Sequence, residues 1–330
     1  MCLNERSFEK QTGASYDDPT YPPAKYSAPG ARVSALTARV AAWEAAGDYE
    51  MVNGHRIFVR RSGGGGALVV LLHGYPTSSY DWREILPALE ASGASVLAFD
   101  FLGFGLSDKP AKSNYSLKDQ ADIAERLIGG SPSLLIAHDM GDSVATELMA
   151  RDLEGSLSFT LNGVLITNGS VIIEKATLTV VQKLLLGRLG PLVARLISEK
   201  AFRKQLADVY SAAHPLTSEE GADQWALLAN RGGNKILNRL SSFNRERATL
   251  ARRWEGAMRN WRGHLDIGWG ELDSISGKPV LEAVIGLVPS AEVTRWPDLG
   301  HYPHIEDPAA VAHLAARFVV GRLGTDPGNA

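Results

Sequence analysis

The chain has 330 residues, 45% of them hydrophobic and 22% charged, with a formal net charge of −3. This length allows one large α/β domain with an insertion, or two smaller domains. The negative charge argues against a nucleic-acid partner, and no apolar run approaches the ~20 residues that a membrane-spanning helix needs. The only cysteine is Cys2, so no disulfide within the chain is possible. Because the N-terminus has no apolar stretch of the kind found in secretory signals, we expect a cytoplasmic protein.

Residues 1–33 are polar and contain several prolines, which predicts an extension without a packed structure of its own. The alanine-rich stretch 34–46 predicts a helix, and residues 50–60 predict a hairpin that turns at Asn53-Gly54. Apolar strand patterns then alternate with helical patterns. They lie at residues 67–72, 79–92, 95–100, 117–128, 133–136, 142–150 and 161–168.

The alternation breaks at about residue 171, and helical patterns alone continue to about residue 254. Strand patterns return at 264–269 and 292–296, before a helix at 308–323. Alternating strands and helices are typical of a doubly wound, mostly parallel sheet. We therefore predict an α/β core at residues 34–170 and 256–330, with a helical cap inserted at residues 171–255.

The pentapeptide Ala137-His138-Asp139-Met140-Gly141 lies between a predicted strand and a predicted helix. Small residues two positions either side of the centre are typical of a nucleophile elbow, whose sharp turn strains the central residue. The centre here is Asp139, and a carboxylate needs no base to become a nucleophile because it is already ionised at neutral pH. The alternative is a plain strand–helix turn with Asp139 as a helix cap.

Two further residues follow later strands. Asp273 comes after the strand that ends near Trp269, and His301 comes after the strand that ends at Trp296. The order nucleophile, acid, histidine is that of the α/β-hydrolase fold, and parallel sheets bind ligands where their strands end. Asp273 as a turn residue and His301 as a solvated loop histidine are the alternatives. The three positions together predict a catalytic triad of Asp139, Asp273 and His301.

The loop after the strand at 67–72 reads His73-Gly74-Tyr75-Pro76. In a fold of this kind, the backbone N–H groups of Tyr75 and Met140 form an oxyanion hole. We expect His73 and Pro76 to border the substrate pocket.

Three blocks of sequence, at residues 73–82, 100–110 and 138–142, resemble the epoxide hydrolase and haloalkane dehalogenase branch of the α/β-hydrolases. Within this branch the blocks are most similar to the mesoderm-specific transcript protein-like group. The resemblance runs from about residue 51 to residue 320. It implies an α/β-hydrolase fold, an Asp nucleophile, and no metal or organic cofactor.

The sequence departs from the dehalogenase pattern at two positions. Haloalkane dehalogenases usually hold the leaving halide with an Asn before the proline and a Trp after the nucleophile, and Tyr75 and Met140 occupy these positions here. A Met side chain has no hydrogen-bond donor. A halide site would then have to come from the cap, for instance from Trp225.

The sequence also departs from the epoxide hydrolase pattern, in which two cap tyrosines protonate the epoxide oxygen. The predicted cap contains one tyrosine, Tyr210, and Phe243 stands at the expected second position. His214 follows Tyr210 by four residues and would share a helix face with it if the helix extends that far. Tyr210, alone or with His214, is therefore the candidate acid, and a packing role for Tyr210 is the alternative.

The favoured function is an epoxide hydrolase that uses a covalent alkyl–enzyme ester, with a small hydrophobic substrate and water as its only partners. Haloalkane dehalogenation by Asp139 is the second hypothesis, and a non-catalytic binding protein is the third. We expect a monomer or a homodimer. The arginine-rich stretch 245–253 also contains acid, and is interpreted as a solvated helix face.

Overall fold

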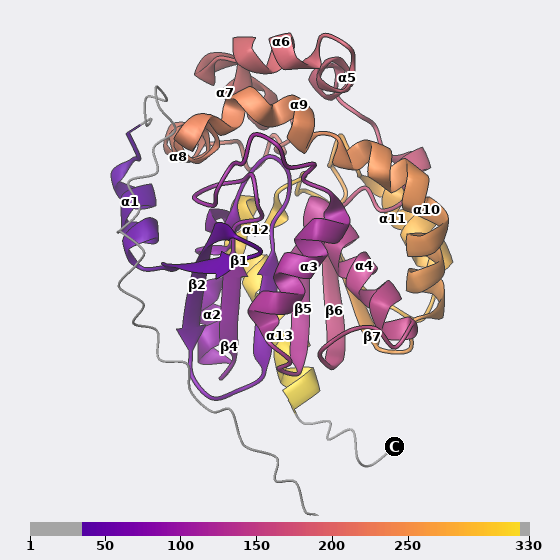
Figure 1. The fold of residues 1–330 in the computed structure, drawn as a ribbon. Coiled ribbons are helices and arrows are strands. Elements are labelled where there is room, and N and C mark those ends of the chain that lie inside the picture. The colour runs from indigo at the N-terminus through magenta and orange to yellow at the C-terminus, as the bar shows by residue number, and fades with distance from the viewer. Residues whose placement is uncertain (1–34, 324–330) are drawn as a thin grey trace, which may run out of the picture. The chain divides into compact units, whose positions relative to one another are not determined.

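The computed structural model describes residues 35–323, so the predicted extension at residues 1–33 lies outside the described part. Eight strands form one sheet in the order β1-β2-β4-β3-β5-β6-β7-β8 (Figure 1). The pairs β1–β2 and β2–β4 are antiparallel, and the other five pairs are parallel. The strands are β1 (Asp48–Val52), β2 (His55–Gly63), β3 (Leu68–Leu72), β4 (Ser95–Phe99), β5 (Ser133–His138), β6 (Leu161–Thr167), β7 (His264–Gly270) and β8 (Glu292–Trp296).

Helices cover both faces of this sheet. Val70 and Leu72 of β3 pack into one apolar cluster with α3, α4 and α11, whereas Val69 and Leu71 pack into another with α2 and α13. Both faces of a parallel strand are thus buried, which explains its unbroken apolar sequence. These outer helices are α1 (Ala38–Ala45), α2 (Leu86–Ala91), α3 (Leu117–Ile128), α4 (Met140–Leu153), α11 (Lys278–Leu287), α12 (Pro303–Glu306) and α13 (Pro308–Leu323).

The segment between β6 and β7 contains helices and no strand. Helices α5 to α9 lie beyond the carboxyl ends of the parallel strands, whereas α10 runs down the side of the core next to α4 (Figure 1). The last helix of the segment, α10, ends at Asn260 and so passes the predicted cap boundary at residue 255. The helices of this segment are α5 (Val180–Leu186), α6 (Gly190–Leu196), α7 (Glu199–Ala207), α8 (Ser218–Ala229), α9 (Leu237–Leu240) and α10 (Phe243–Asn260), with short 3-10 turns η2 (Ile173–Lys175) and η3 (Asn230–Ile236).

The predicted fold class, a doubly wound and mostly parallel sheet of the α/β-hydrolase type, is confirmed. The predicted helix at 79–92 is instead two elements, the 3-10 turn η1 (Ser79–Trp82) and α2. Pro87 stands in the first turn of α2, where its missing N–H costs no intrahelical bond, so it favours a new helix start there. Among residues 35–323, no helix is long and apolar enough to cross a membrane.

Helix α4 packs closely on the strand beside it. A Cβ atom added to Gly141, in the first turn of α4, would lie 2.3 Å from the carbonyl oxygen of Leu72 at the end of β3. Because the opposing atom belongs to the backbone, it cannot rotate away as a side chain would. Gly141 therefore permits the distance at which the turn after β5 meets the loop after β3.

We expect Gly141→Ala to lower the free energy of unfolding by about 1–3 kcal/mol, because the added methyl overpacks this contact. Chemical denaturation measures the change. Gly256→Ala is the matched control, since it lies inside α10 with nothing within 4 Å of the added Cβ, and Ala favours helix over Gly. An equal loss of stability in both variants would contradict the packing argument.

Candidate active site

Asp139 stands on the turn between β5 and α4, with φ 47° and ψ −104°. This positive φ is rare for a non-glycine residue and marks local backbone strain. Its carboxylate is buried, and its Oδ2 atom accepts a hydrogen bond of 3.0 Å from the backbone N–H of Tyr75. Met140 is the first residue of α4, where a backbone N–H has no acceptor within the helix. The loop after β3 thus places one backbone donor at the carboxylate of Asp139.

His301 and Asp273 lie on the loops that follow β8 and β7. The Nδ1 atom of His301 is 2.8 Å from Oδ2 of Asp273, and both side chains are buried. The carboxylate of Asp273 also accepts hydrogen bonds from the Ser276 hydroxyl (2.5 Å), the Ile275 N–H (2.7 Å) and the Asn168 amide (3.1 Å). These bonds fix the orientation of the carboxylate, and therefore of the imidazole that it faces.

The pKa values of these groups follow from burial and from their neighbours. Burial alone would raise the pKa of Asp273, but the charge and hydrogen bond of His301 lower it to about 2. Burial would lower the pKa of His301, but the Asp273 carboxylate raises it above its ordinary value. Burial would likewise raise the pKa of Asp139, and the charges of Arg247 and His301 instead hold it below its ordinary range. Asp139 is therefore ionised at neutral pH.

Arg247 was not expected at this site. Its side chain is 2% exposed, and its Nη2 atom lies 2.7 Å from the backbone oxygen of Asp139 and 3.3 Å from Oδ1. Its Nε atom donates to the Ser143 hydroxyl at 2.8 Å. The interpretation of residues 245–253 as a solvated face is wrong at this position. Arg247 lies four residues after buried Phe243 and seven before buried Trp254, so the helical period of the apolar residues could have identified it.

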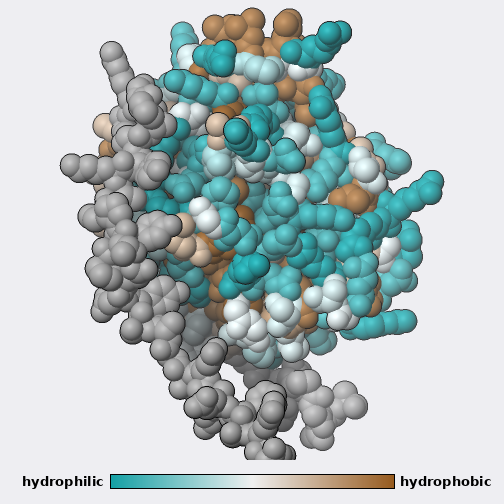
Figure 2. Space-filling model, viewed as in Figure 1, coloured by the Kyte–Doolittle hydropathy of each residue, from teal (hydrophilic) through white to brown (hydrophobic). Residues whose placement is uncertain are grey.

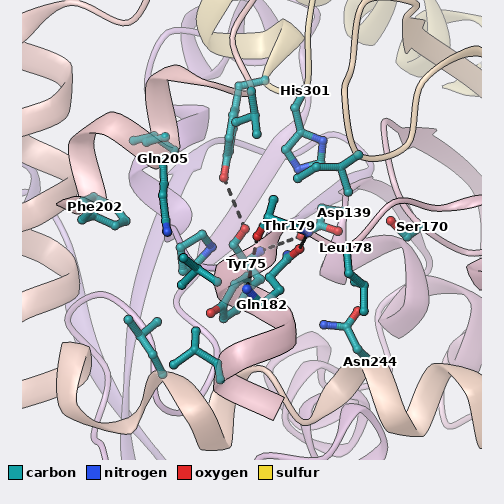
Figure 3. Close-up of a pocket in the computed structure, with 18 of the residues that line it drawn as sticks. Tyr75, Asp139, Ser170, Leu178, Thr179, Gln182, Phe202, Gln205, Asn244 and His301 are labelled. Carbon is teal, nitrogen blue, oxygen red and sulfur yellow. Dashed lines mark hydrogen bonds between the residues drawn. The ribbon is translucent and has the colours of Figure 1, made fainter. Parts of the chain in front are cut away.

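One cavity joins these groups, with about 730 Å³ of empty space including its open mouth. Asp139, His301 and Arg247 all border it, and Figure 3 shows the side chains of Asp139 and His301 on the same side of it. Apolar side chains from the helical segment form much of its wall, with a few amides among them. These are Leu178, Val181, Gln182, Leu185, Ile197, Phe202, Gln205, Leu206, Val209, Leu237 and Asn244.

The residues predicted on the loop after β3 differ in their placement. Tyr75 and Pro76 border the cavity. His73 does not, because its Nε2 atom accepts the Phe101 N–H (2.9 Å) and its Nδ1 atom lies 2.8 Å from the Gly74 oxygen. Burial lowers the pKa of His73 to about 3. His73 is thus a neutral side chain that connects two loops beneath the cavity.

The four residues predicted on the cap lie outside the cavity lining. Tyr210 stacks on Tyr302 with ring centroids 5.3 Å apart. His214 is partly exposed and lies 3.7 Å from Asp298. Trp225 packs against Phe202 at 5.8 Å, and Phe243 lies behind Tyr75 at 5.3 Å. Tyr210 and His214 follow the end of α7 at Ala207 and precede α8, so they share no helix face as the sequence analysis had expected. Trp225 and Phe243 lie on α8 and α10, whose rotation the sequence spacing alone does not define.

Tyr302 is a cavity residue that the sequence analysis did not select. It follows His301 directly, borders the cavity, and donates its hydroxyl to the carbonyl oxygen of Tyr75 at 3.2 Å. Burial raises its pKa well above the ordinary value, so the phenol stays protonated at neutral pH.

Among residues 35–323, no group of three or more His, Cys, Asp or Glu side chains is placed to hold a metal ion.

The chain belongs to the alpha/beta hydrolase family, whose pattern matches residues 69–314. It is 44% identical to LipZ of Mycobacterium tuberculosis over 80% of this chain and 92% of LipZ. It is 35% identical to the mesoderm-specific transcript homolog protein of Bos taurus, over 86% and 89% of the two chains. The predicted resemblance is thereby confirmed.

Solved structures share the fold at lower identity. A loop variant of the haloalkane dehalogenase DbeA from Bradyrhizobium elkanii aligns with a TM-score of 0.70 at 22% identity, over 83% of this chain and 96% of that one. The epoxide hydrolase CorEH aligns with a TM-score of 0.66 at 22% identity, over 82% and 97%.

We expect Arg247→Met to raise the pKa of Asp139, because burial of the carboxylate is then opposed by one positive charge fewer. A carbon-13 NMR titration of the aspartate carboxyl groups reports this value. Arg247→Lys keeps a positive charge and should give a smaller rise. Arg253→Met, on the same helix but paired with Glu147 and Glu154, is the control and should leave Asp139 unchanged. An unaltered Asp139 titration in Arg247→Met would show that the ion pair does not keep the carboxylate ionised.

Proposed function

We propose that this chain is a hydrolase that uses Asp139 as a nucleophile, forms an alkyl–enzyme ester, and converts a hydrophobic epoxide into a diol. The observation that carries this proposal is the position of the buried carboxylate of Asp139. It is held on a strained turn, with a backbone N–H at one oxygen, and it borders the same cavity as His301. A buried carboxylate with a lowered pKa is suited to attack on a carbon atom.

In the first half-reaction, one oxygen of Asp139 attacks an epoxide carbon, and the ring C–O bond breaks. The leaving oxygen becomes a strongly basic alkoxide and needs a proton. Tyr302 is a protonated phenol at the cavity wall, and an epoxide oxygen bound there would replace the Tyr75 carbonyl as its acceptor. The phenol of Tyr75 also borders the cavity, but its hydroxyl is already paired with the Ser241 hydroxyl at 2.8 Å. This role replaces the one expected of Tyr210, whose side chain lies outside the cavity lining.

In the second half-reaction, His301 takes a proton from water, which attacks the ester carbonyl carbon of Asp139. Asp273 stabilises the resulting imidazolium, since its carboxylate lies 2.8 Å from Nδ1. The N–H groups of Tyr75 and Met140 stabilise the oxyanion. When the ester C–O bond breaks, the leaving oxygen takes the proton from the His301 imidazolium. The proton of the carboxylic acid formed at Asp139 returns to the Tyr302 phenolate, so that the diol leaves a carboxylate and a phenol behind.

Haloalkane dehalogenation by Asp139 is the alternative reaction, since both steps at the carboxylate would be the same. A halide needs hydrogen-bond donors. None of the described residues that line the cavity is a tryptophan, and Trp225 lies outside it, so the donors would have to be amide side chains or Arg247. The cavity does contain the Tyr302 phenol, which can supply a proton and so favours an epoxide. A panel of epoxides beside a panel of haloalkanes, measured by diol and halide release, distinguishes the two reactions. A chain that only binds ligands would release neither product.

We expect His301→Gln to be alkylated by an epoxide substrate but to hydrolyse the ester very slowly, because the base that activates water is missing. Mass spectrometry of the intact protein should show an increase equal to the mass of the epoxide. Peptide mapping should place it on Asp139, and the double variant with Asp139→Ala should show no increase. Full turnover by His301→Gln would place the base elsewhere.

We expect Tyr302→Phe to lower epoxide turnover by about 10²–10⁴, the usual cost of losing one positioned acid. Halide release from any haloalkane substrate should change little, because a halide leaves without a proton. Tyr210→Phe is the matched control, since this phenol stacks on Tyr302 but does not border the cavity. Epoxide turnover that falls equally in both variants, or in neither, would remove Tyr302 as the acid.

A further inference from the structure

The outer face of α5 and α6 carries an unusual concentration of exposed aliphatic side chains. Five of the nine large hydrophobic residues that are exposed in the described part of the chain lie within these two helices and the turn between them. They are Val180 (72% exposed), Leu184 (50%), Leu189 (69%), Leu192 (54%) and Leu196 (72%), and we call them the outer apolar patch. Figure 2 shows hydrophobic residues gathered at the top of the molecule, where Figure 1 places α5 and α6.

Positive charge surrounds the outer apolar patch. Lys183, Arg188 and Arg195 lie on the same two helices or the turn between them, and all three are exposed. Residues 176–198 contain no Asp or Glu, although the whole chain has a net charge of −3. Arg245 adds a further cation here, because its guanidinium donates to the carbonyl oxygen of Leu186. The patch is therefore both apolar and locally cationic on an otherwise acidic protein.

The same two helices also face the cavity. Val181, Gln182 and Leu185 of α5 border the cavity, whereas Val180 and Leu184 point outward. Ile197, just after α6, borders the cavity, whereas its neighbour Leu196 is 72% exposed. This thin layer thus has an apolar surface toward solvent and another toward the cavity. Packing around the cavity explains the apolar residues on the inner side of this layer, but it does not explain the outer apolar patch.

We propose that the outer apolar patch binds the surface of an anionic phospholipid bilayer. Aliphatic side chains flanked by Lys and Arg are typical of helices that lie at a membrane interface, where cations meet lipid phosphates and the apolar face enters the acyl boundary. A second copy of the chain fits less well, because pairing the patch with itself would bring Arg188 and Arg195 of both copies together without any acid on these helices. Each helix has seven residues, which is far fewer than the ~20 that span a bilayer. The proposed contact is therefore with the membrane surface.

Membrane contact here would place the cavity directly beneath the lipid. A hydrophobic substrate dissolved in the bilayer could then pass between α5 and α6 without crossing water. This delivery step rests on the proposed function, whereas binding of the patch to lipid does not. Vesicle binding is therefore measured without substrate, so that failure of one proposal is distinguishable from failure of the other.

The test is co-sedimentation of the full-length protein with vesicles of phosphatidylcholine alone, or mixed with phosphatidylglycerol. The protein should bind the mixed vesicles, bind them less at high salt, and bind phosphatidylcholine weakly. The triple variant Leu189→Ser, Leu192→Ser, Leu196→Ser should lose binding about tenfold or more. A separate variant, Arg188→Gln with Arg195→Gln, should lose the preference for phosphatidylglycerol, because each basic residue near an anionic surface contributes to binding.

The matched control is Met51→Ser, Leu272→Ser, Val320→Ser, which removes three side chains of similar exposure outside the patch. It should bind vesicles as the parent does. Circular dichroism and turnover of a water-soluble substrate show that each variant is folded. Three results would overturn the proposal: a parent that stays in the supernatant with both vesicles, a triple variant that binds like the parent, or a control that loses binding equally. Light scattering that shows a dimer dependent on the patch, without vesicle binding, would instead assign the patch to a second copy.

Discussion

The buried negative charge of Asp139 is the constraint on which the rest of the site depends. A carboxylate taken out of water costs several kcal/mol unless charges and donors compensate for it. Tyr75 donates its N–H to one oxygen, and the guanidinium of Arg247 lies 3.3 Å from the other. Arg247 is itself buried, so each group compensates for the desolvation of the other. Helix α10, the last helix of the segment between β6 and β7, therefore keeps the central residue of the core elbow ionised.

Helix α10, which carries Arg247, is attached to α4 of the core by hydrogen bonds. Glu147 of α4 accepts hydrogen bonds from the Trp254 indole at 2.9 Å and from Arg253 at 2.8 Å. By contrast, Leu185 is the only buried residue of α5, and the buried residues of α6 are the small Gly190 and Ala194. Few buried contacts mean a low cost of local opening. Substrate entry is thus expected at α5 and α6, while α10 stays fixed on the core.

The sequence could predict the core part of the site, because Asp139, Asp273 and His301 each follow a strand, and parallel strands end at the same edge of a sheet. The cap part could not be predicted in the same way. Tyr210 and His214 lie beyond the end of α7 at Ala207, so their four-residue spacing defines no common helix face. Tyr302 precedes α12, on a core loop whose path the spacing of apolar residues does not define. Arg247 was missed because charge outweighed helical period in the interpretation of α10. The signal in the sequence was the spacing of Arg247 from Phe243 and Trp254, which places all three on one face of the helix.

The ion pair also bears on the direction of the proposed reaction. Ester formation removes the negative charge from Asp139, so Arg247 becomes a buried cation without its partner. An uncompensated buried charge is destabilising by roughly 3–5 kcal/mol, and this destabilises the ester relative to the free carboxylate. A developing alkoxide would be attracted to the released guanidinium until Tyr302 protonates it. Hydrolysis then restores the carboxylate and with it the ion pair. An arginine that stabilises the resting nucleophile would in this way also favour turnover of the intermediate over its accumulation.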